Sequence, residues 1–319
     1  MRTCLVTGAG GFVGSAVAAA LLKRGDRVVA VGRTRSDRWL PGAVKIEGDV
    51  ADLRLMRDLI SRYEPSEVYH YAAHSIVRSA LRDLSGAALT NVFGTAAVLA
   101  AVADAQSQAR VLIASTDKSY GEQMGVRESD PLRPEHVYDA TKAGADLLAQ
   151  AAARDLGLRV VITRCCNIYG PGDMQFSRLV PATLLALAEG RRPALNAGAA
   201  QMEREFIYVQ DYVRAALMLV QMLGEPMCIE KGCHYGSAWN VGTGEVFKVG
   251  EAIRMICRAA GRPDLQPEQL AGTGAHELRA QSVDTTKLRS IGWAPEWSFE
   301  RGIAETVRWY DHHFGGGQA

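Results

Sequence analysis

The amino-acid sequence predicts an α/β protein with a doubly wound parallel sheet and a smaller C-terminal domain. Short apolar or β-prone runs alternate with helical patterns through the first half of the chain, which is typical of a parallel sheet covered by helices. A glycine cluster at residues 8–14 separates the first such run from the first helical pattern. The 319 residues suffice for roughly two domains.

The elements of the first half follow in regular order. Each expected strand is a short apolar or β-branched run, and each expected helix has apolar residues at helical spacing. The expected strands are Arg2–Thr7, Arg27–Val31, Val44–Glu47, Val68–Tyr71, Arg110–Ala114 and Leu158–Thr163. The expected helices are Ser15–Arg24, one beginning near Leu53, Ser85–Ala105, and one from Tyr138 to about Leu156.

A glycine-proline cluster at 170–172 interrupts this rhythm, and we expect a domain boundary there. Residues 1–172, joined by parts of 206–240, would form the first domain, and residues 173–319 mainly the second. The elements expected in the second half are helices at Phe176–Glu189, Tyr212–Leu223, Val249–Ala260 and Phe299–His312, and strands at Phe206–Val209 and near Ala238.

Composition excludes several classes of function. The formal net charge of +1 does not indicate binding to nucleic acid or to an acidic membrane surface. The six cysteines show neither metal-ligand spacing nor a disulfide framework. We therefore expect no metal site, and we expect the protein to lie in a reducing compartment. The first apolar run is short and leads into the glycine cluster, so we expect no signal peptide and a cytoplasmic protein.

The glycine cluster has the spacing Gly-x-x-Gly-x-x-Gly. Strand, glycine loop and helix in this order are the context of a Rossmann-like dinucleotide fingerprint. Gly8 would permit the tight turn, Gly11 would let the backbone approach a pyrophosphate, and Gly14 would let the helix pack on the strand. Phe12 and Val13 lie between them, where the helix N-terminus faces the phosphates. The alternative is an ordinary turn between a strand and a helix.

Residues that follow the next strands are candidates for the rest of a dinucleotide site. Gly32-Arg33-Thr34-Arg35 stands where an acidic residue would bind ribose hydroxyls, and arginines there suit the 2′-phosphate of NADP, although they could also be solvated loop charges. Asp49 could accept a hydrogen bond from adenine or cap the following helix. The remaining candidates are Val50, the small residues Ala72 and Ala73, and Asn91.

The most informative stretch is Ser115–Gly121, which follows the Arg110–Ala114 strand where open α/β sheets place their ligands. Tyr138 and Lys142 share one face of the next helix because they are spaced i and i+4. An ammonium beside a phenol lowers the tyrosine pKa toward working pH, which makes Tyr138 a candidate general base. The spacing alone also fits an exposed helix face, but the preceding motifs favour catalysis.

Taken together, the motifs resemble the extended short-chain dehydrogenase/reductase family of nucleotide-sugar epimerases and dehydratases. The resemblance covers nearly the whole chain. It rests on Thr7–Gly14, Gly48-Asp49-Val50, Ala72-Ala73-His74, Asn91–Thr95, Tyr138-x-x-x-Lys142, Arg164–Pro171, Arg204–Asp211, Asn240–Gly244 and Asp284–Lys287. Glu205 and Gln210 depart from the residues usual in the family.

Within the family, Thr116-Asp117-Lys118 looks like the 4,6-dehydratase branch, of the CDP-glucose type. The resemblance implies that Tyr138 and Thr116 act on the sugar C4 hydroxyl, that Asp117 protonates the leaving C6 hydroxyl, and that Lys118 stands where the C5 base is found. Two alternatives remain: a C4 epimerase that uses Tyr138 and Lys142, and a non-catalytic dinucleotide-binding protein of the same fold.

The resemblance also implies the ligands and the assembly. The cofactor would be NAD or NADP, tightly bound and recycled, and the arginines at Arg33 and Arg35 favour NADP. A nucleotide-diphosphate sugar would be the substrate, and the protein would be a homodimer formed through the alanine-rich helices. The candidate substrate-binding residues are His74, Arg78, Asn167, Arg178, Arg204 and Arg279; for several of these a turn, capping or ion-pair role is the alternative.

Overall fold

The structure is a computed structural model that describes residues 1–33, 40–223, 225, 234–273 and 278–314. Its larger lobe is built on a seven-stranded sheet in which every neighbouring pair is parallel. The strand order is β11-β7-β5-β4-β1-β2-β3. The strands are β1 (Thr3–Thr7), β2 (Arg27–Gly32), β3 (Val44–Glu47), β4 (Glu67–His70), β5 (Arg110–Thr116), β7 (Val160–Cys165) and β11 (Ser237–Val241).

This strand order confirms the doubly wound sheet and locates its switch point. From β1 the chain first adds β2 and β3 on one side and then β4, β5, β7 and β11 on the other. The carboxyl ends of β1 and β4 therefore flank a crevice, which is where sheets of this kind bind ligands.

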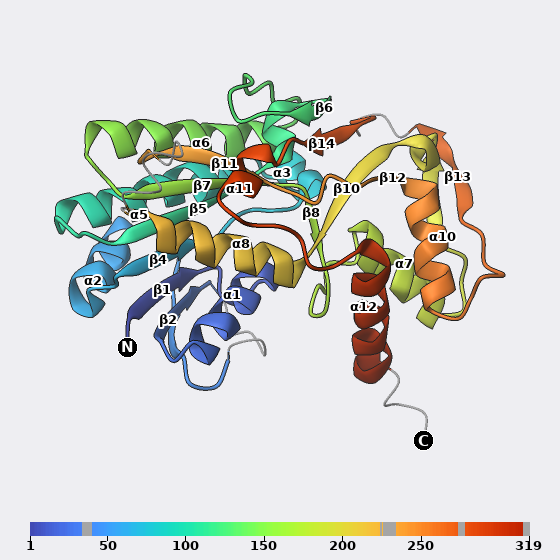
Figure 1. Cartoon of the computed structure of the whole chain (residues 1–319), viewed down its shortest axis with the longest axis horizontal. Helices are drawn as coiled ribbons and strands as arrows, with labels where there is room; N and C mark the ends of the chain where they lie inside the picture. The colour runs from blue at the N-terminus through green and yellow to red at the C-terminus, as the bar shows by residue number, and fades with distance from the viewer. Residues whose placement is uncertain (34–39, 224, 226–233, 274–277, 315–319) are drawn as a thin grey trace.

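Helices cover both faces of the sheet (Figure 1). Helix α1 packs against α8, and their apolar side chains share a core cluster with one face of the strands. On the other face α5 packs against both α2 and α6. The bounds are α1 (Phe12–Lys23), α2 (Leu53–Tyr63), α5 (Gly94–Asp104), α6 (Val137–Asp155) and α8 (Val209–Met222).

The expected helix at Ser85–Ala105 differs in detail. It consists of α4 (Leu84–Ala88), a π-helical turn η1 (Leu89–Phe93) and α5. Short π-helical turns inside α-helices are often found at functional sites. This turn places the buried side chain of Asn91 toward α6, where it donates to Thr141 Oγ1 at 2.8 Å.

The smaller lobe lies to the right in Figure 1 and has its own core. Tyr169, Tyr208, Phe206 and Phe299 form a cluster of ring contacts at its centre. Its elements are β8 (Asn167–Tyr169), α7 (Leu179–Ala188), β9 (Ala194–Ala197), η3 (Ala199–Gln201), β10 (Glu203–Tyr208), β12 (Val246–Lys248), α10 (Val249–Ala259), β13 (Glu268–Thr273) and α12 (Phe299–Phe314).

Several short elements were not expected from the sequence. Strand β6 (Gln123–Val126) pairs in parallel with β14 (Gln281–Val283), and β9 pairs with β13. Others include the 3₁₀ turn η2 (Asp117–Tyr120) and the helices α3 (Val77–Arg82) and α11 (Thr286–Ser290). The pairing of β6 with β14 brings the C-terminal third of the chain against the larger lobe.

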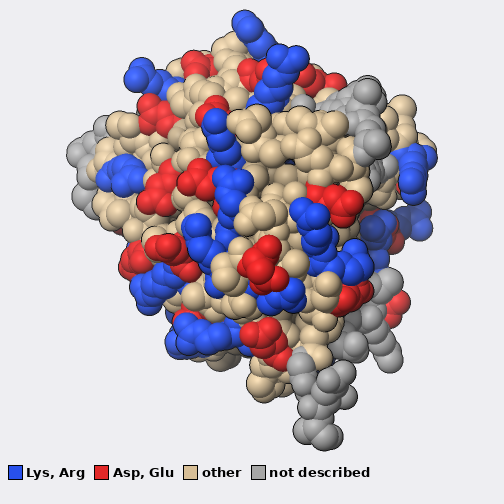
Figure 2. Space-filling model, turned by 90° about the vertical axis from the view of Figure 1, so that its right-hand side faces the viewer, with Lys and Arg blue, Asp and Glu red and all other residues tan. Residues whose placement is uncertain are grey.

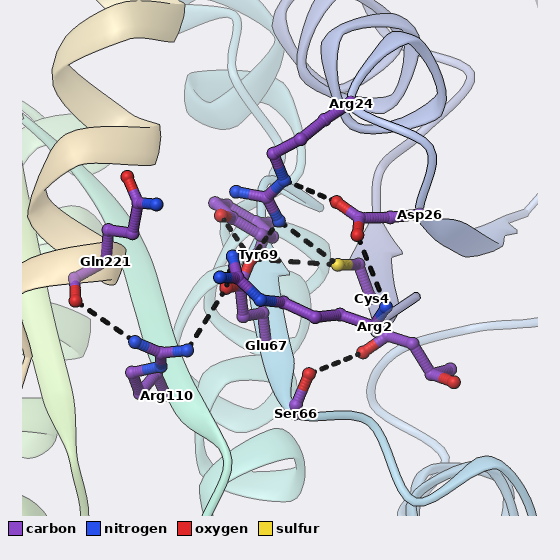
Figure 3. Close-up of polar contacts among 10 residues, drawn as sticks. Arg2, Cys4, Arg24, Asp26, Ser66, Glu67, Tyr69, Arg110 and Gln221 are labelled. Atoms are coloured by element: carbon purple, nitrogen blue, oxygen red, sulfur yellow. Dashed lines mark hydrogen bonds and ion pairs between the residues drawn. The ribbon is translucent and has the colours of Figure 1, made fainter.

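A buried ion cluster lies at the amino end of the sheet, away from the crevice (Figure 3). The carboxylate of Glu67 is completely buried and binds Arg24 at 2.6 Å, Arg2 at 3.2 Å and Arg110 at 3.4 Å. Tyr69 also donates to it, at 2.9 Å. Since the carboxylate is fully paired, we interpret the cluster as structural.

The exposed face of the smaller lobe has no single-sign patch: Figure 2 shows basic and acidic side chains interspersed there. One segment, Leu84–Asp104, is long and apolar enough to cross a membrane by composition. More than half of its most apolar window, 56%, is buried inside the protein, where it packs against α2 and α6. It is therefore a core helix of the larger lobe.

Candidate functional site

A cleft of about 1120 Å³ opens at the carboxyl ends of β1, β4 and β5 and extends to the smaller lobe. Its walls include the glycine loop, the Thr116–Lys118 stretch, the first turn of α6 and residues of β8, α7 and β10. The site thus combines a dinucleotide-type crevice with a second wall from the smaller lobe.

The glycine loop has the geometry that its spacing predicts. Gly8 has a φ of +67°, and a Cβ there would lie 2.6 Å from Ala72 N. A Cβ on Gly14 would lie 2.2 Å from Gly8 O, so only glycine allows α1 to start this close to the loop. The glycines bring backbone to this wall of the cleft, and the start of α1 there fits a diphosphate.

Thr116, Asp117 and Lys118 lie together on the floor of the cleft, at the end of β5. Thr116 Oγ1 donates to Asp117 Oδ1 at 3.1 Å and accepts from the Lys118 N–H at 3.3 Å. Asp117 is 3% exposed, and burial raises its pKa, opposed chiefly by the charge of Lys118. This environment favours a protonated carboxyl group that can donate to a ligand.

Tyr138 and Lys142 line the same cleft from the first turns of α6. The expected lowering of the tyrosine pKa is not seen, because burial dominates and raises the pKa of Tyr138 to about 12. The charge of Arg178 and a hydrogen bond with Thr116 oppose this rise. Burial lowers the pKa of Lys142 to about 8, and its ammonium donates to the carbonyl of Ala114.

A buried histidine that the sequence analysis did not single out lies beneath these residues. His70, at the end of β4, contacts Thr7 Oγ1 through Nδ1 at 2.8 Å and Thr95 Oγ1 through Nε2 at 3.1 Å. Burial, together with the nearby charge of Lys142, lowers its pKa to about 3. A neutral imidazole therefore connects β1, β4 and α5 below the cleft.

The predicted cofactor residues separate into two groups. Those that line the cleft are Gly8, Gly11, Phe12, Val13, Gly14, Arg33, Val50, Ala72, Ala73, Tyr138 and Lys142. Asp49 and Asn91 do not. Asp49 accepts from Ala51 N, and the cap of α2 is Asp52, so the alternative role of Asp49 as helix cap is wrong. Arg35 lies outside the described residues.

Asn91 acts within the protein rather than on the cleft wall. Its amide oxygen accepts from the backbone N–H of His74 at 2.8 Å, while its amide nitrogen donates to Thr141. It therefore connects the loop after β4 to the helix that holds Tyr138. Asn91 lies within the π-helical turn, which the sequence did not predict.

Three of the predicted substrate residues line the cleft: Asn167, Arg178 and Arg204. Arg178 also pairs with the buried Asp173 at 3.2 Å. His74 is turned away and contacts Ser79 Oγ at 2.7 Å, and Arg279 is exposed beside the cleft. The side chain of Arg78 lies outside the described part of the chain.

Some cleft residues were missed. Ser115, Cys165 and Cys166 line the cleft at the ends of β5 and β7, and the rule that ligands lie at strand ends would have identified them. Among the described residues, no group of three His, Cys, Asp or Glu is arranged to hold a metal ion.

Comparison with known proteins gives a consistent result. The profile of the family described as GDP-mannose 4,6 dehydratase matches residues 5–306. The low-salt glycan biosynthesis protein Agl12 of Haloferax volcanii is 34% identical, over 96% of this chain and 97% of that protein. A dTDP-glucose 4,6-dehydratase of Xanthomonas campestris is 31% identical, over 97% of this chain and 93% of that protein.

Solved structures agree with these sequence matches. DesIV, a dTDP-glucose 4,6-dehydratase of Streptomyces venezuelae crystallised with NAD, superimposes with a TM-score of 0.86 at 31% identity, covering 98% of both chains. A UDP-glucose 4-epimerase of Thermotoga maritima superimposes with a TM-score of 0.88 at 25% identity, over 98% of this chain and 99% of that one. The fold is thus shared by dehydratases and epimerases.

Proposed function

The chain belongs to the GDP-mannose 4,6 dehydratase family of extended short-chain dehydrogenases and is a nucleotide-sugar 4,6-dehydratase, a lyase, and on this premise we propose the roles of its residues. The observation that supports these roles best is the position of Asp117. Its carboxyl group is buried, faces the cleft and lies within the same short stretch as Thr116 and Lys118. A C4 epimerase needs no acid at C6, whereas a 4,6-dehydratase does.

In the first step Tyr138 takes the proton of the sugar C4 hydroxyl, and Thr116 orients that hydroxyl. The glycine loop would hold a nicotinamide dinucleotide, which would supply the acceptor for the C4 hydride and the donor of that hydride to C6. Lys142 lies one turn after Tyr138, where its ammonium can hold the ribose hydroxyls of the cofactor and favour the tyrosinate. The pKa of the phenol is about 12 because burial outweighs the charge of Arg178 and the hydrogen bond with Thr116, which both lower it.

The second step removes water across C5 and C6. The C4 ketone acidifies the C5 proton, which Lys118 removes as a neutral amine. Asp117 donates its proton to the C6 oxygen as the C6–O bond breaks. Hydride then returns to C6 and a proton to C5, so the substrate has lost only water and the cofactor is unchanged.

The diphosphate of the substrate is proposed to bind Arg204, Arg178 and Asn167, which face the cleft from the smaller lobe. Guanidinium groups match phosphate oxygens in geometry. Arg279 would contribute from the rim. The Thr116-Asp117-Lys118 sequence resembles CDP-glucose enzymes, whereas the relatives above include dTDP-glucose 4,6-dehydratases, so the proposed substrate is dTDP-glucose or CDP-glucose.

A panel experiment tests this function. The purified enzyme is incubated separately with dTDP-glucose, CDP-glucose, GDP-mannose and UDP-glucose, and the products are weighed by mass spectrometry. Loss of one water from dTDP-glucose or CDP-glucose is the expected result. An isobaric product instead of water loss would mean that the enzyme is a C4 epimerase, and water loss from GDP-mannose alone would contradict the proposed substrate.

The cofactor proposed for the enzyme is NAD. Arg33 is exposed and lines the cleft, which is compatible with a 2′-phosphate, but DesIV was crystallised with NAD and the expected preference for NADP has no support among the solved relatives. Mass spectrometry of cofactor released from the purified protein distinguishes the two.

A homodimer is proposed on the basis of exposed apolar residues. Leu84, Leu89 and Phe93 on the α4–η1 segment are 62%, 49% and 63% exposed, and Leu147 on the adjacent α6 is 54% exposed. Such side chains on two neighbouring helices form a face that a second copy can cover as a four-helix bundle. We place this dimer in the cytoplasm.

A further inference from the structure

Lys118 is held by a residue from a distant part of the chain. Its Nζ donates to Gln281 Oε1 at 2.8 Å, and Gln281 lies on β14, 163 residues further along. Gln281 is 1% exposed and does not line the cleft, so it contacts Lys118 from the interior of the protein. Among the described residues, this is the one side-chain hydrogen bond that Lys118 makes.

A second charged group near Lys118 is the carboxylate of Asp139, the residue after Tyr138, on α6 where that helix packs against η2. Asp139 is completely buried, and neither of its oxygens makes a hydrogen bond of ordinary geometry within the described residues. The charged and titratable groups near it are Lys118 and Asp117 from η2 and His136 and Tyr138 from its own segment. A buried carboxylate in such a position is stabilised by a nearby cation, and Lys118 becomes that cation once it has taken the C5 proton.

We infer that Asp139 and Gln281 are positioning residues that act through Lys118, holding its amino group beside Asp117 and balancing its charge after it takes the C5 proton. The inference rests on the role proposed above for Lys118.

The chemistry explains why such support is needed. When the Lys118 amine takes the C5 proton, the electron pair of the C5–H bond forms the C5=C6 bond and the C6–O bond breaks. Lys118, which is half-buried, is then an ammonium. When hydride reaches C6, the electron pair of the double bond takes a proton at C5, and the same ammonium supplies it. A carboxylate and an amide oxygen stabilise the ammonium between these two events.

The charge on Asp139 depends on pH. Burial raises its pKa to about 6, and the charge of Lys118 opposes the rise. The carboxylate is therefore present above about pH 6 and is lost below it. The rate of water loss by the wild-type enzyme should fall as the pH is lowered through about 6. Asp139→Asn, which has a neutral amide at this position, should not show this decrease.

The test uses the full-length enzyme loaded with NAD and the sugar nucleotide that the wild type dehydrates. Asp139→Asn and Gln281→Met are compared with Lys118→Met and with both double variants. Each single change should slow water loss about tenfold to a hundredfold: Gln281→Met removes one hydrogen bond to a charged group, and Asp139→Asn removes one nearby negative charge. Reduced nicotinamide should accumulate, because Tyr138 is intact and C4 oxidation continues.

Added to Lys118→Met, neither change should slow water loss further, because the group through which they act is gone. The matched controls are Asp155→Asn, an exposed site on the same helix, and Gln269→Met, an exposed site on β13; both should behave as wild type. If Asp139→Asn does not fold, Gln281→Met tests the same connection without altering α6.

Two results overturn the inference: wild-type water loss in Asp139→Asn and Gln281→Met, or slowing by the same factor with and without Lys118. If Asp139→Asn and Gln281→Met dehydrate at the wild-type rate while Lys118→Met accumulates reduced nicotinamide, the inference fails but the proposed role of Lys118 stands. If Lys118→Met itself dehydrates at the wild-type rate, that role fails as well.

Discussion

Asp146 and Arg164 form a two-pronged ion pair inside the larger lobe, with Nε 2.9 Å from Oδ2 and Nη2 3.0 Å from Oδ1. The two side chains are 0% and 3% exposed. Asp146 lies one turn after Lys142 on α6, and Arg164 lies on β7. The pair therefore anchors the helix that holds Tyr138 and Lys142 to the sheet.

Asp146→Asn should lower the free energy of unfolding by about 3–5 kcal/mol, because it leaves Arg164 as an uncompensated buried charge. Urea denaturation followed by circular dichroism measures the change. Asp155→Asn, on the exposed side of the same helix, should unfold at the wild-type urea concentration. Equal midpoints for both variants would show that the pair contributes little.

Asp117→Asn should separate oxidation from elimination. The amide keeps the shape of the carboxyl group but cannot protonate the C6 oxygen, and general acid help is worth about 100- to 10,000-fold. Reduced nicotinamide should accumulate, which its absorbance reports, while water loss slows by that factor. Tyr138→Phe, the matched control at the other step, should give neither signal. Conversion by Asp117→Asn at the wild-type rate would refute the acid role.

His70 should make the protein less stable in mild acid. The folded-state pKa is about 3, whereas an unfolded histidine binds its proton near ~6.5, so the unfolded chain gains protons first as the pH falls. Between pH 7 and pH 5 this should remove about 2 kcal/mol from the free energy of unfolding. Urea denaturation of wild type and His70→Asn at both pH values isolates the effect, since the variant should lose less. Identical losses would contradict a buried neutral His70.

Arg33→Ala tests recognition of the adenosine ribose. Because only NADP has a phosphate there, the change should weaken NADP binding about tenfold while altering NAD binding little. Isothermal titration of cofactor-free protein with each dinucleotide provides the two dissociation constants. Equal weakening of both would mean that Arg33 does not contact the 2′-phosphate.

Phe93→Glu should convert the proposed dimer to a monomer, because it places a charge in the centre of the exposed apolar face. Light scattering at micromolar concentration measures the mass. Leu270→Glu, at an exposed apolar residue of β13 in the smaller lobe, serves as control and should leave the mass unchanged. A monomeric wild type would refute the assembly.

Much of the larger lobe could be predicted because its signals are local. Apolar runs, the glycine spacing and the Tyr138–Lys142 interval each specify structure within a few residues. The contacts that hold the site residues in place could not be predicted, because they depend on the pairing of segments that are far apart in the sequence. Gln281 reaches Lys118 only through the pairing of β14 with β6, and Asn91 faces α6 from within a π-helical turn.

The tyrosine pKa shows a second limit of sequence reasoning. Spacing places Lys142 near Tyr138, but the balance between burial and charge depends on how deeply the cleft encloses the phenol. The burial of Asp139 also could not be predicted from the sequence, because acidic residues are usually exposed. It is buried because α6 packs against η2.

The sheet of the larger lobe draws its last strand and one covering helix from late in the chain, since α8 ends at Met222 and β11 ends at Val241. During synthesis, a chain that has emerged only to residue 172 has one edge of β7 unpaired and lacks α8 on one face. The lobe closes only after residue 241 has left the ribosome, when α7, β9 and β10 have also emerged. The nascent protein therefore exposes apolar sheet until α8 and β11 have emerged, and a chain truncated before residue 241 should be prone to aggregation.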